Sequence, residues 1–176
     1  MRFLPLLLTA LTATAALAAP VEFTVEAPAT GTKFSRSDAA GKYVAVHFLL
    51  KTECPVCLRH TREHFKRAGE LPDVVPVFLK PDSADEIRAW LGKLGDEAAK
   101  QPVIYRDPDA ALARRLQIPD GYAFHGETVH YPALVLLNAS GEEVFRYVGK
   151  NNGDRFGFDQ LAAKVAELKA AAAPKP

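Results

Sequence analysis

The sequence has 176 residues, of which 48% are hydrophobic and 24% charged, with 22 Lys and Arg against 21 Asp and Glu. This near-neutral balance argues against nucleic acid or an anionic membrane surface as the main partner. The 2 cysteines are too few for a disulfide-rich scaffold, and a chain of this length can bury a core without one. We therefore expect one globular domain with a single cysteine pair.

The first residues have the pattern of a secretory signal peptide. Arg2 gives a positive start, residues 3–11 are mostly apolar, and Ala16 and Ala18 match the small-x-small pattern of a cleavage site. The apolar run is too short to cross a bilayer as a membrane anchor. We predict an exported, periplasmic protein with a signal peptide at 1–18, a domain at 19–170 and a flexible tail at 171–176.

The first half of the remaining chain alternates strand and helix patterns. Residues 42–50 form a near-continuous apolar run, which is typical of a strand covered on both faces. Residues 55–68 turn polar and helical before Gly69. We further predict a strand at 74–80 and then a helix that Ser83 caps and Gly95 ends, with its buried face made of Ile87, Trp90, Leu91 and Leu94.

The second half continues this alternation. We predict a short strand at 102–107 and a helix at 107–118, with Asp107 as its cap and Pro108 in its first turn. A loop at 119–130 precedes a hairpin at 133–149, which turns at 138–141. A final helix buries Phe158, Leu161, Val165 and Leu168. This order predicts an α/β fold, in which a central mixed sheet has helices on both faces.

The two cysteines, Cys54 and Cys57, lie where the first strand gives way to the first helix. A thiol at a helix N-terminus faces free N–H groups, which lower its pKa from about 8.5 to about 3.5–7.5. We predict that Cys54 is the more exposed and more acidic thiol and attacks a disulfide. Cys57, one turn later, is then the buried thiol that resolves the mixed disulfide. Pro55 starts the helix without the loss of a hydrogen bond.

Other uses of the pair fit less well. A purely structural disulfide would close a loop of only a few residues and constrain little. A structural zinc site needs four ligands, and the sequence has no second cysteine pair. His60 and His64 have a four-residue spacing that suits a metal, but basic residues surround them, so we interpret this helix as solvent-exposed. We expect no metal ligands and no cofactor.

The sequence resembles the thioredoxin superfamily, and within it the exported redoxins (TlpA and AhpC/TSA-like proteins), from about Phe34 onward. The resemblance rests on "GKYVAVHFLLKTECPVC", "QPVIYRDPDAALARRLQI" and "YPALVLLNASGEEVFRYVG". It implies a thioredoxin-like fold and a thiol–disulfide oxidoreductase that acts on exported proteins and is recycled by a redox partner. We expect a monomer whose partners are protein thiols and disulfides.

The resemblance also implies roles for residues around the thiols. Pro132 would open the strand that faces the active site, after a cis Tyr131–Pro132 bond, and Tyr131 would present its backbone to the sulfur of the substrate. Pro55 and Val56, between the two cysteines, would be further substrate contacts.

Three features depart from the thioredoxin pattern. Phe48 stands where many thioredoxins carry a buried carboxylate, and Glu53 replaces the tryptophan often found before the first cysteine. Because an acidic neighbour raises the pKa of a thiol, the direction of electron flow stays open. The segment 120–130 resembles an insertion, and we expect it to lie over the active site.

Two further functions stay open as alternatives. Peroxiredoxins share this fold, and their reactive cysteine follows a Pro-x-x-x-Thr-x-x-Cys pattern and is helped by an arginine. Here Thr52 is two residues before Cys54, and Val129 and His130 stand about where that arginine would.

The other alternative is copper delivery. Sco-like proteins bind copper through two cysteines and a histidine, which would be Cys54, Cys57 and His130 here. The Sco cysteines, however, are separated by three residues and these by two. We expect His130 to lie near the thiols but to be dispensable for disulfide exchange.

Overall fold

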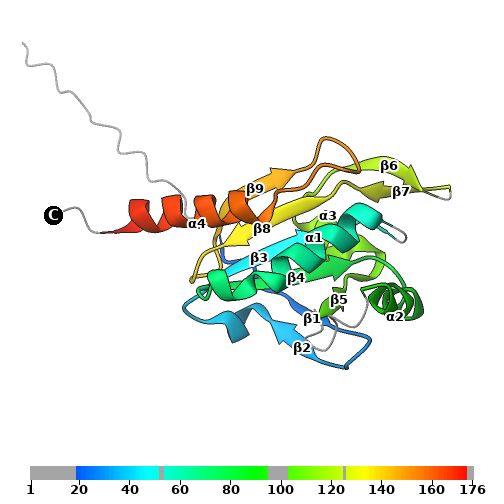
Figure 1. Ribbon diagram of the computed structural model, residues 1–176, viewed down its shortest axis with the longest axis horizontal. Coiled ribbons are helices and arrows are strands. Elements are labelled where there is room, and N and C mark those ends of the chain that lie inside the picture. Colours follow the sequence, from blue (N-terminus) through cyan, green and yellow to red (C-terminus); the bar gives the residue numbers. More distant parts are fainter. Residues whose placement is uncertain (1–18, 52–53, 95–102, 125, 174–176) are drawn as a thin grey trace, which may run out of the picture.

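The computed structural model describes residues 19–51, 54–94, 103–124 and 126–173. A seven-stranded sheet forms the centre of the domain (Figure 1). Its strands, in spatial order, are β2 (Lys33–Ser35), β1 (Thr24–Glu26), β5 (Ile104–Arg106), β4 (Val74–Lys80), β3 (Tyr43–Phe48), β8 (Ala133–Leu137) and β9 (Glu143–Val148). A separate two-stranded sheet pairs β6 (Asp120–Phe124) with β7 (Glu127–His130).

The three central strands pair in parallel, and the other neighbouring pairs of this sheet are antiparallel. β3 pairs with β4 and β4 with β5 in parallel, whereas β8 is antiparallel to β3 and β9 to β8. Parallel neighbours need a crossover segment, and helices supply it in both cases. The carboxyl end of β3 therefore leads directly toward the helix that carries the cysteines, and the predicted α/β fold with a mixed sheet is confirmed.

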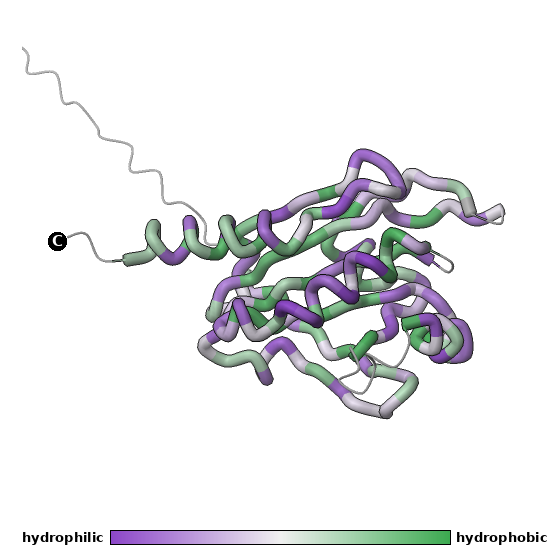
Figure 2. Tube along the Cα trace, viewed as in Figure 1, coloured by the Kyte–Doolittle hydropathy of each residue, from purple (hydrophilic) through white to green (hydrophobic). Residues whose placement is uncertain are grey.

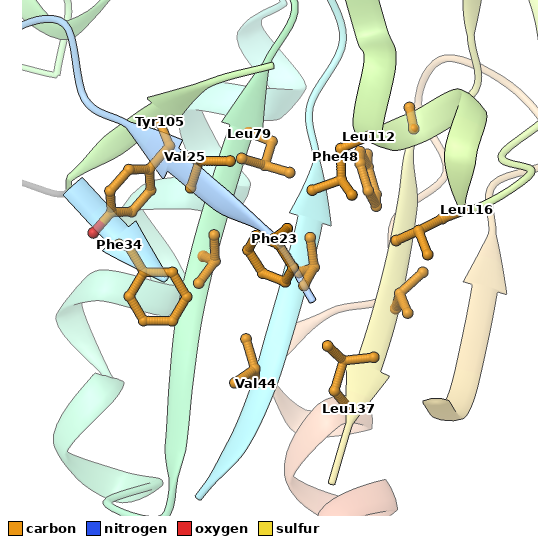
Figure 3. Packing of buried hydrophobic residues seen from close by; sticks show 14 of the residues in the cluster. Phe23, Val25, Phe34, Val44, Phe48, Leu79, Tyr105, Leu112, Leu116 and Leu137 are labelled. Atoms are coloured by element: carbon orange, nitrogen blue, oxygen red, sulfur yellow. The ribbon is translucent and has the colours of Figure 1, made fainter. Parts of the chain in front are cut away.

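Helices cover both faces of this sheet. On β3, Val44, Val46 and Phe48 point to one face and Ala45 and His47 to the other, because side chains alternate along a strand. The first face packs against α3 (Ala111–Arg115), and Figure 3 shows its Leu112 beside Phe48 and close to Leu116. The second face packs against α1 (Pro55–Lys66), α2 (Ala84–Gly92) and α4 (Phe158–Ala172).

The helix α1 has an unusual composition for a helix that lies on a sheet. Figure 2 shows hydrophilic residues along most of it. Its buried residues are Cys57, His60, Thr61 and His64, with no aliphatic side chain among them. The fully buried residues of this helix face are therefore mostly polar or titratable groups that lose contact with water, and not aliphatic core residues.

Several predicted elements agree with the structure. The strand at 74–80 has the predicted bounds, and Ser83 caps α2 through a hydrogen bond from the Glu86 N–H. The hairpin at 133–149 and the final helix are also present, and the helix continues to Ala172, two residues into the predicted tail. Gly95 lies outside the described residues, as does the predicted signal peptide.

Two predicted elements were wrong. The helix expected at 107–118 is reduced to α3, because Asp109 and Ala110 adopt left-handed backbone angles with φ of 53° and 52°. Asp107 still acts as a cap, but its carboxylate accepts from the N–H groups of Leu112 and Ala113 across that kink. The expected loop at 119–130 is the β6–β7 hairpin. Among the helices of the described residues, none combines the length and hydropathy that a membrane span requires.

Candidate active site

The cysteine pair occupies the start of α1. Cys54 is the N-cap residue of this helix, and its sulfur accepts a hydrogen bond from the Cys57 N–H at 3.1 Å. Both residues are free thiols within an apolar cluster that includes Leu49, Phe78 and Ile87. Cys54 is 9% exposed and Cys57 is 0% exposed, so the predicted order of exposure is confirmed.

An arginine that the sequence analysis did not identify contacts both sulfurs. Arg155 lies in the loop between β9 and α4, and its Nη2 is 3.4 Å from Cys54 Sγ and 3.1 Å from Cys57 Sγ. Its Nη1 donates to the carbonyl oxygens of Asn152 and Asp154, which fixes the guanidinium in this position. A guanidinium here stabilises a thiolate on either cysteine.

The two thiols titrate as a pair. Burial raises the pKa of Cys57, but the hydrogen bond from the Cys54 thiol and the positive charge of Arg155 outweigh it and lower that pKa to about 6. The hydrogen bond to Cys57, together with burial, raises the pKa of Cys54. These directions are opposite to the predicted order of acidity, because the hydrogen bond between the two sulfurs favours the negative charge on Cys57, with Arg155 beside it. One proton leaves the pair easily, and the remaining one is shared between the sulfurs.

The β6–β7 hairpin contacts the cluster that contains the thiols through Tyr122. Tyr122 packs against the cluster that contains both cysteines, and the Lys51 N–H donates to its hydroxyl at 3.1 Å. Lys51, which follows β3, also forms an ion pair with Glu127 of β7. Burial raises the pKa of Tyr122 to about 12. Tyr122 thus brings the first strand of the segment 120–130 next to the active site, a contact that the sequence did not reveal.

Pro132 is close to this site, but its peptide bond is not the predicted one. It lines a cavity of about 10 Å³ together with His60 and Arg155. All described peptide bonds, including Tyr131–Pro132, are trans, so the predicted cis bond was wrong. Trans is the more stable isomer by about 0.5–1 kcal/mol, and hydrogen bonds hold the chain on both sides of the bond. The Tyr131 N–H donates to the Pro119 carbonyl, and the Pro132 carbonyl accepts from Gly149.

The proposed substrate contacts differ in accessibility. Pro55 is exposed and Val56 is half-buried between the two cysteines. The backbone of Tyr131 already has partners within the protein, since its carbonyl oxygen also lies 2.8 Å from His130 Nδ1. A substrate would have to displace these hydrogen bonds to use that backbone. The roles of these residues stay predictions.

His130 does not join the thiols. Its side chain is 2% exposed, and its ring packs edge-on against Phe48 on the α3 side of the sheet. Cys54 and Cys57 lie on the α1 side, so the structure does not bring together the three ligands of the copper hypothesis. Thr52 and Glu53 lie outside the described residues.

Three other histidines do come together. His47 of β3 and His60 and His64 of α1 are 2%, 7% and 2% exposed, so the prediction of an exposed histidine face on this helix was wrong. Their potential ligand atoms lie within 4.8 Å of one another. Burial lowers the pKa of all three, to about 2 for His60 and about 4 for His64. All three rings are therefore neutral at neutral pH.

A buried ion pair supports the segment before the thiols. The ammonium group of Lys80, at the end of β4, donates to the Leu50 carbonyl at 2.7 Å and lies 3.3 Å from the Asp82 carboxylate. Both side chains are 0% exposed. The hydrogen bond to Leu50 fixes the chain where it leaves β3 toward Cys54.

A family model for the AhpC/TSA family matches residues 17–142. This match covers most of the sequence and includes both cysteines. The chain belongs to the AhpC/TSA family. The family assignment confirms the resemblance to the redoxins of the thioredoxin superfamily and makes the protein a thiol-based oxidoreductase. A search of curated proteins found no match.

Solved structures with this fold include both peroxiredoxins and disulfide oxidoreductases. The peroxiredoxin 6 of Arenicola marina has a TM-score of 0.76 and 15% identity, over 92% of this chain and 77% of that one. AhpC of Enterococcus faecalis has a TM-score of 0.72 and 17% identity, over 91% and 96%. The exposed lipoprotein thioredoxin of Streptococcus pneumoniae has a TM-score of 0.63 and 19% identity, over 84% and 99%. These similarities confirm the thioredoxin-like fold of this AhpC/TSA protein.

Proposed function

We propose that the protein is a thiol–disulfide oxidoreductase that exchanges disulfides with other proteins through Cys54 and Cys57. The observation that supports this function is the pair itself. Two free thiols share one turn of α1, a common proton and a common guanidinium. A pair in this arrangement can close to a disulfide and reopen.

The accessibility of the two cysteine residues supports an order for the steps. Cys54 is the only one of the two with exposed surface, so its thiolate attacks a sulfur of the partner's disulfide. This step forms a mixed disulfide and releases one partner thiolate. The Cys57 thiolate then attacks Cys54 Sγ, forms the Cys54–Cys57 disulfide and releases the second partner thiolate. Two electrons reach the partner, and a second thiol protein must restore the dithiol.

Arg155 serves both steps because it contacts both sulfurs. The charge that it stabilises rests mainly on Cys57 in the resting pair. The hydrogen bond between the sulfurs allows the proton to move from Cys54 to Cys57 as Cys54 attacks. The partner thiolate released in the first step can take this proton from Cys57, and the same guanidinium then stabilises the Cys57 thiolate for the resolving step.

Peroxide reduction is a second candidate, and Arg155 is the observation that favours it. Peroxiredoxins use an arginine to assist their reactive cysteine, and Arg155 Nη2 lies 3.1 Å from Cys57 Sγ. Cys54 precedes Cys57 by three residues, which is the position that the peroxiredoxin pattern gives to threonine. In this case Cys57 would attack the peroxide, and Cys54 would resolve the resulting sulfenic acid.

Trapping experiments with the two single cysteine variants separate these functions. For the oxidoreductase, Cys57→Ser accumulates mixed disulfides with protein substrates through Cys54, and Cys54→Ser does not. The wild-type protein also reduces insulin with a thiol donor. For the peroxidase, Cys54→Ser retains one turnover with hydrogen peroxide and carries a sulfenic acid on Cys57. Rapid peroxide consumption by Cys54→Ser without insulin reduction by the wild type would refute our assignment.

We also propose that the protein is exported and acts as a monomer in the periplasm. The positive start, the apolar run and the Ala16-x-Ala18 pattern support export. Fusion of residues 1–18 to a reporter enzyme that is active only after export tests the first point. A fusion that stays inactive and is retained in the cytoplasm would contradict it. Analytical ultracentrifugation of the dithiol form tests the second.

A further inference from the structure

The buried face of α1 places three imidazoles where a helix normally buries aliphatic side chains. The rings of His60 and His64 lie 4.3 Å apart, and the ring of His47 lies 5.2 Å and 4.6 Å from them. The four-residue spacing of His60 and His64 puts both rings on one side of the helix, opposite β3. Aromatic rings of Phe78 and Phe158 enclose the cluster. The three histidines therefore form one site between a strand and a helix.

Among the described residues, hydrogen bonding leaves two nitrogens of this site unpaired. His60 Nε2 lies 3.2 Å from His47 Nδ1, which is the one hydrogen bond recorded between the rings. His47 Nε2 and His64 Nε2 are buried and have no hydrogen-bond partner in the described part of the protein. Buried polar atoms are normally paired, and an unpaired one requires an explanation such as an ion. The orphaned His64 Nε2 indicates that the cluster has a ligand.

The geometry and chemistry of the cluster suit a transition-metal ion. Imidazole nitrogens that bind one tetrahedral Zn²⁺ at about 2.0–2.1 Å lie about 3.3 Å apart. The nitrogens of His47 and His60 are already 3.2 Å apart, and the potential ligand atoms of all three residues lie within 4.8 Å. A small rotation of the His64 ring would complete the set. Burial keeps the rings neutral, so their lone pairs are free for a metal at neutral pH.

A cavity beside two of the three rings offers room for a fourth ligand. The cavity of about 10 Å³ beside Pro132 is lined by His47 and His60. A cavity of this size has room for about one water molecule. Three histidines and one water or hydroxide form a common tetrahedral zinc site, and a bound hydroxide would offset part of the ion's charge. This compensation matters because the Arg155 guanidinium lines the same cavity.

We propose that His47, His60 and His64 bind one divalent transition-metal ion, with Zn²⁺ as the preferred ion, behind the cysteine pair. Imidazole ligands suit Zn²⁺, and the absence of a carboxylate among the three ligands disfavours Mg²⁺ and Ca²⁺. The site differs from the copper site considered from the sequence, because it uses neither the thiols nor His130. It ties β3 to α1 directly behind the turn that holds Cys54 and Cys57.

The experiment has to remove the thiols, since a reduced cysteine pair can bind Zn²⁺ by itself. We would titrate Zn²⁺ into the Cys54→Ser/Cys57→Ser protein by calorimetry and measure its thermal unfolding with and without Zn²⁺. We expect one ion per chain and a rise in the unfolding temperature. Addition of His64→Leu should weaken Zn²⁺ binding by more than about 100-fold, because loss of a ligand exceeds the 10–100-fold effect of outer-shell changes.

His130→Leu in the same thiol-free protein is the matched control. His130 is as buried as His64 but lies outside the cluster, so Zn²⁺ affinity should stay within about threefold. If His64→Leu fails to fold, the absorption spectrum of Co²⁺ in the thiol-free protein reports tetrahedral nitrogen ligation. Failure of the thiol-free protein to bind Zn²⁺, or equal binding with His64→Leu, would overturn the proposal. Zn²⁺ binding only by the reduced wild type would assign the ion to the thiols and also overturn it.

Discussion

Arg155 donates a hydrogen bond from Nη2 to Cys57 Sγ over 3.1 Å, although 98 positions separate the two residues in the chain. The contact is made possible by the loop that follows β9, which returns the chain to the start of α1. The guanidinium supplies positive charge to a pair of thiols whose burial would otherwise keep them protonated. The reactivity of the pair therefore depends on a residue outside the cysteine motif.

Replacement of Arg155 by Met should raise the apparent pKa of the first thiol by about 1–2 units, because an opposite charge within a few ångströms is lost. Arg155→Lys should retain part of the effect. The ultraviolet absorbance of the thiolate, followed against pH, measures this pKa. Arg146→Met is the control, since Arg146 pairs with Glu143 on β9 and contacts neither sulfur. An unchanged pKa in Arg155→Met would show that helix-start geometry alone sets the acidity.

Much of the fold could be predicted from local signals. The apolar run at 74–80 and the Ser83 capping box are short-range patterns whose physical cause lies within a few residues, and both are confirmed. The helix at 107–118 shows the limit of this reasoning. Its pattern is helical, but Asp109 and Ala110 take left-handed angles, so tertiary packing overrides local preference.

The sequence predicts only those residues of the candidate site that lie close together in the chain. Cys54 and Cys57 share one turn, so their spacing reveals them. Arg155 lies in a loop with no motif of its own. To predict the histidine cluster, one must know which face of the sheet each side chain of β3 points to. His47 points toward α1, but the sequence alone does not show which helix covers that face. Basic neighbours at His60 and His64 suggested an exposed face. Arg59, Arg62 and Lys66 are indeed exposed, but both histidines are buried against the sheet.

The buried pair of Lys80 and Asp82 gives a prediction about stability. Lys80→Met removes a cation that is 3.3 Å from the Asp82 carboxylate, with both side chains 0% exposed. We expect a loss of about 3–5 kcal/mol in the free energy of unfolding, because a charge stays buried without this partner. Lys80→Met/Asp82→Leu should lose less than Lys80→Met alone. Urea denaturation measures both.

Lys33→Met is the control for this prediction. The side chain of Lys33 pairs with Glu26 at 3.7 Å, but the two side chains are 70% and 57% exposed. An exposed ion pair contributes at most about 1 kcal/mol. A loss in Lys80→Met as small as that in Lys33→Met would show that water or another group compensates for Lys80.

The histidine cluster predicts an acid-sensitive fold when metal is absent. Burial, followed by the charge of Arg67, lowers the pKa of His64 to about 4 from a usual 6.5. Between pH 6.5 and about 4, His64 therefore binds a proton in the unfolded chain but stays neutral in the folded chain. The stability contribution is complete above pH 6.5 and is lost as the pH falls toward 4, by up to about 1.4 kcal/mol per pH unit.

Urea denaturation in EDTA at several pH values between 6.5 and 4 measures this dependence. His64→Leu removes the titrating group, so its stability should fall less over this range, by about 1–3 kcal/mol. Carboxylates that titrate near pH 4 are common to both proteins and cancel in the comparison. Parallel pH profiles for the two proteins would contradict the buried, neutral state of His64.

The contact between Gly149 and Pro132 yields a prediction that links packing to activity. The Gly149 N–H donates to the Pro132 carbonyl at 2.8 Å. A Cβ at Gly149 would lie 2.6 Å from the Asp154 carbonyl oxygen and 2.8 Å from Pro132 Cγ. Gly149→Ala must therefore displace backbone next to Arg155, at a cost of about 1–3 kcal/mol. Because this displacement moves the guanidinium away from the sulfurs, the apparent thiol pKa should also rise.

Gly92→Ala is the matched substitution in an open position. No atom of the described residues lies within 4 Å of a Cβ there, and Gly92 ends α2, so Ala should be neutral or stabilise by up to about 1 kcal/mol. Thermal unfolding and thiol titration of both variants give the comparison. If Gly149→Ala matched Gly92→Ala in both measurements, the loop would have room to shift, and the tight contact with Pro132 would not position Arg155. A loss of stability with an unchanged thiol pKa would separate the packing role of Gly149 from any effect on the guanidinium.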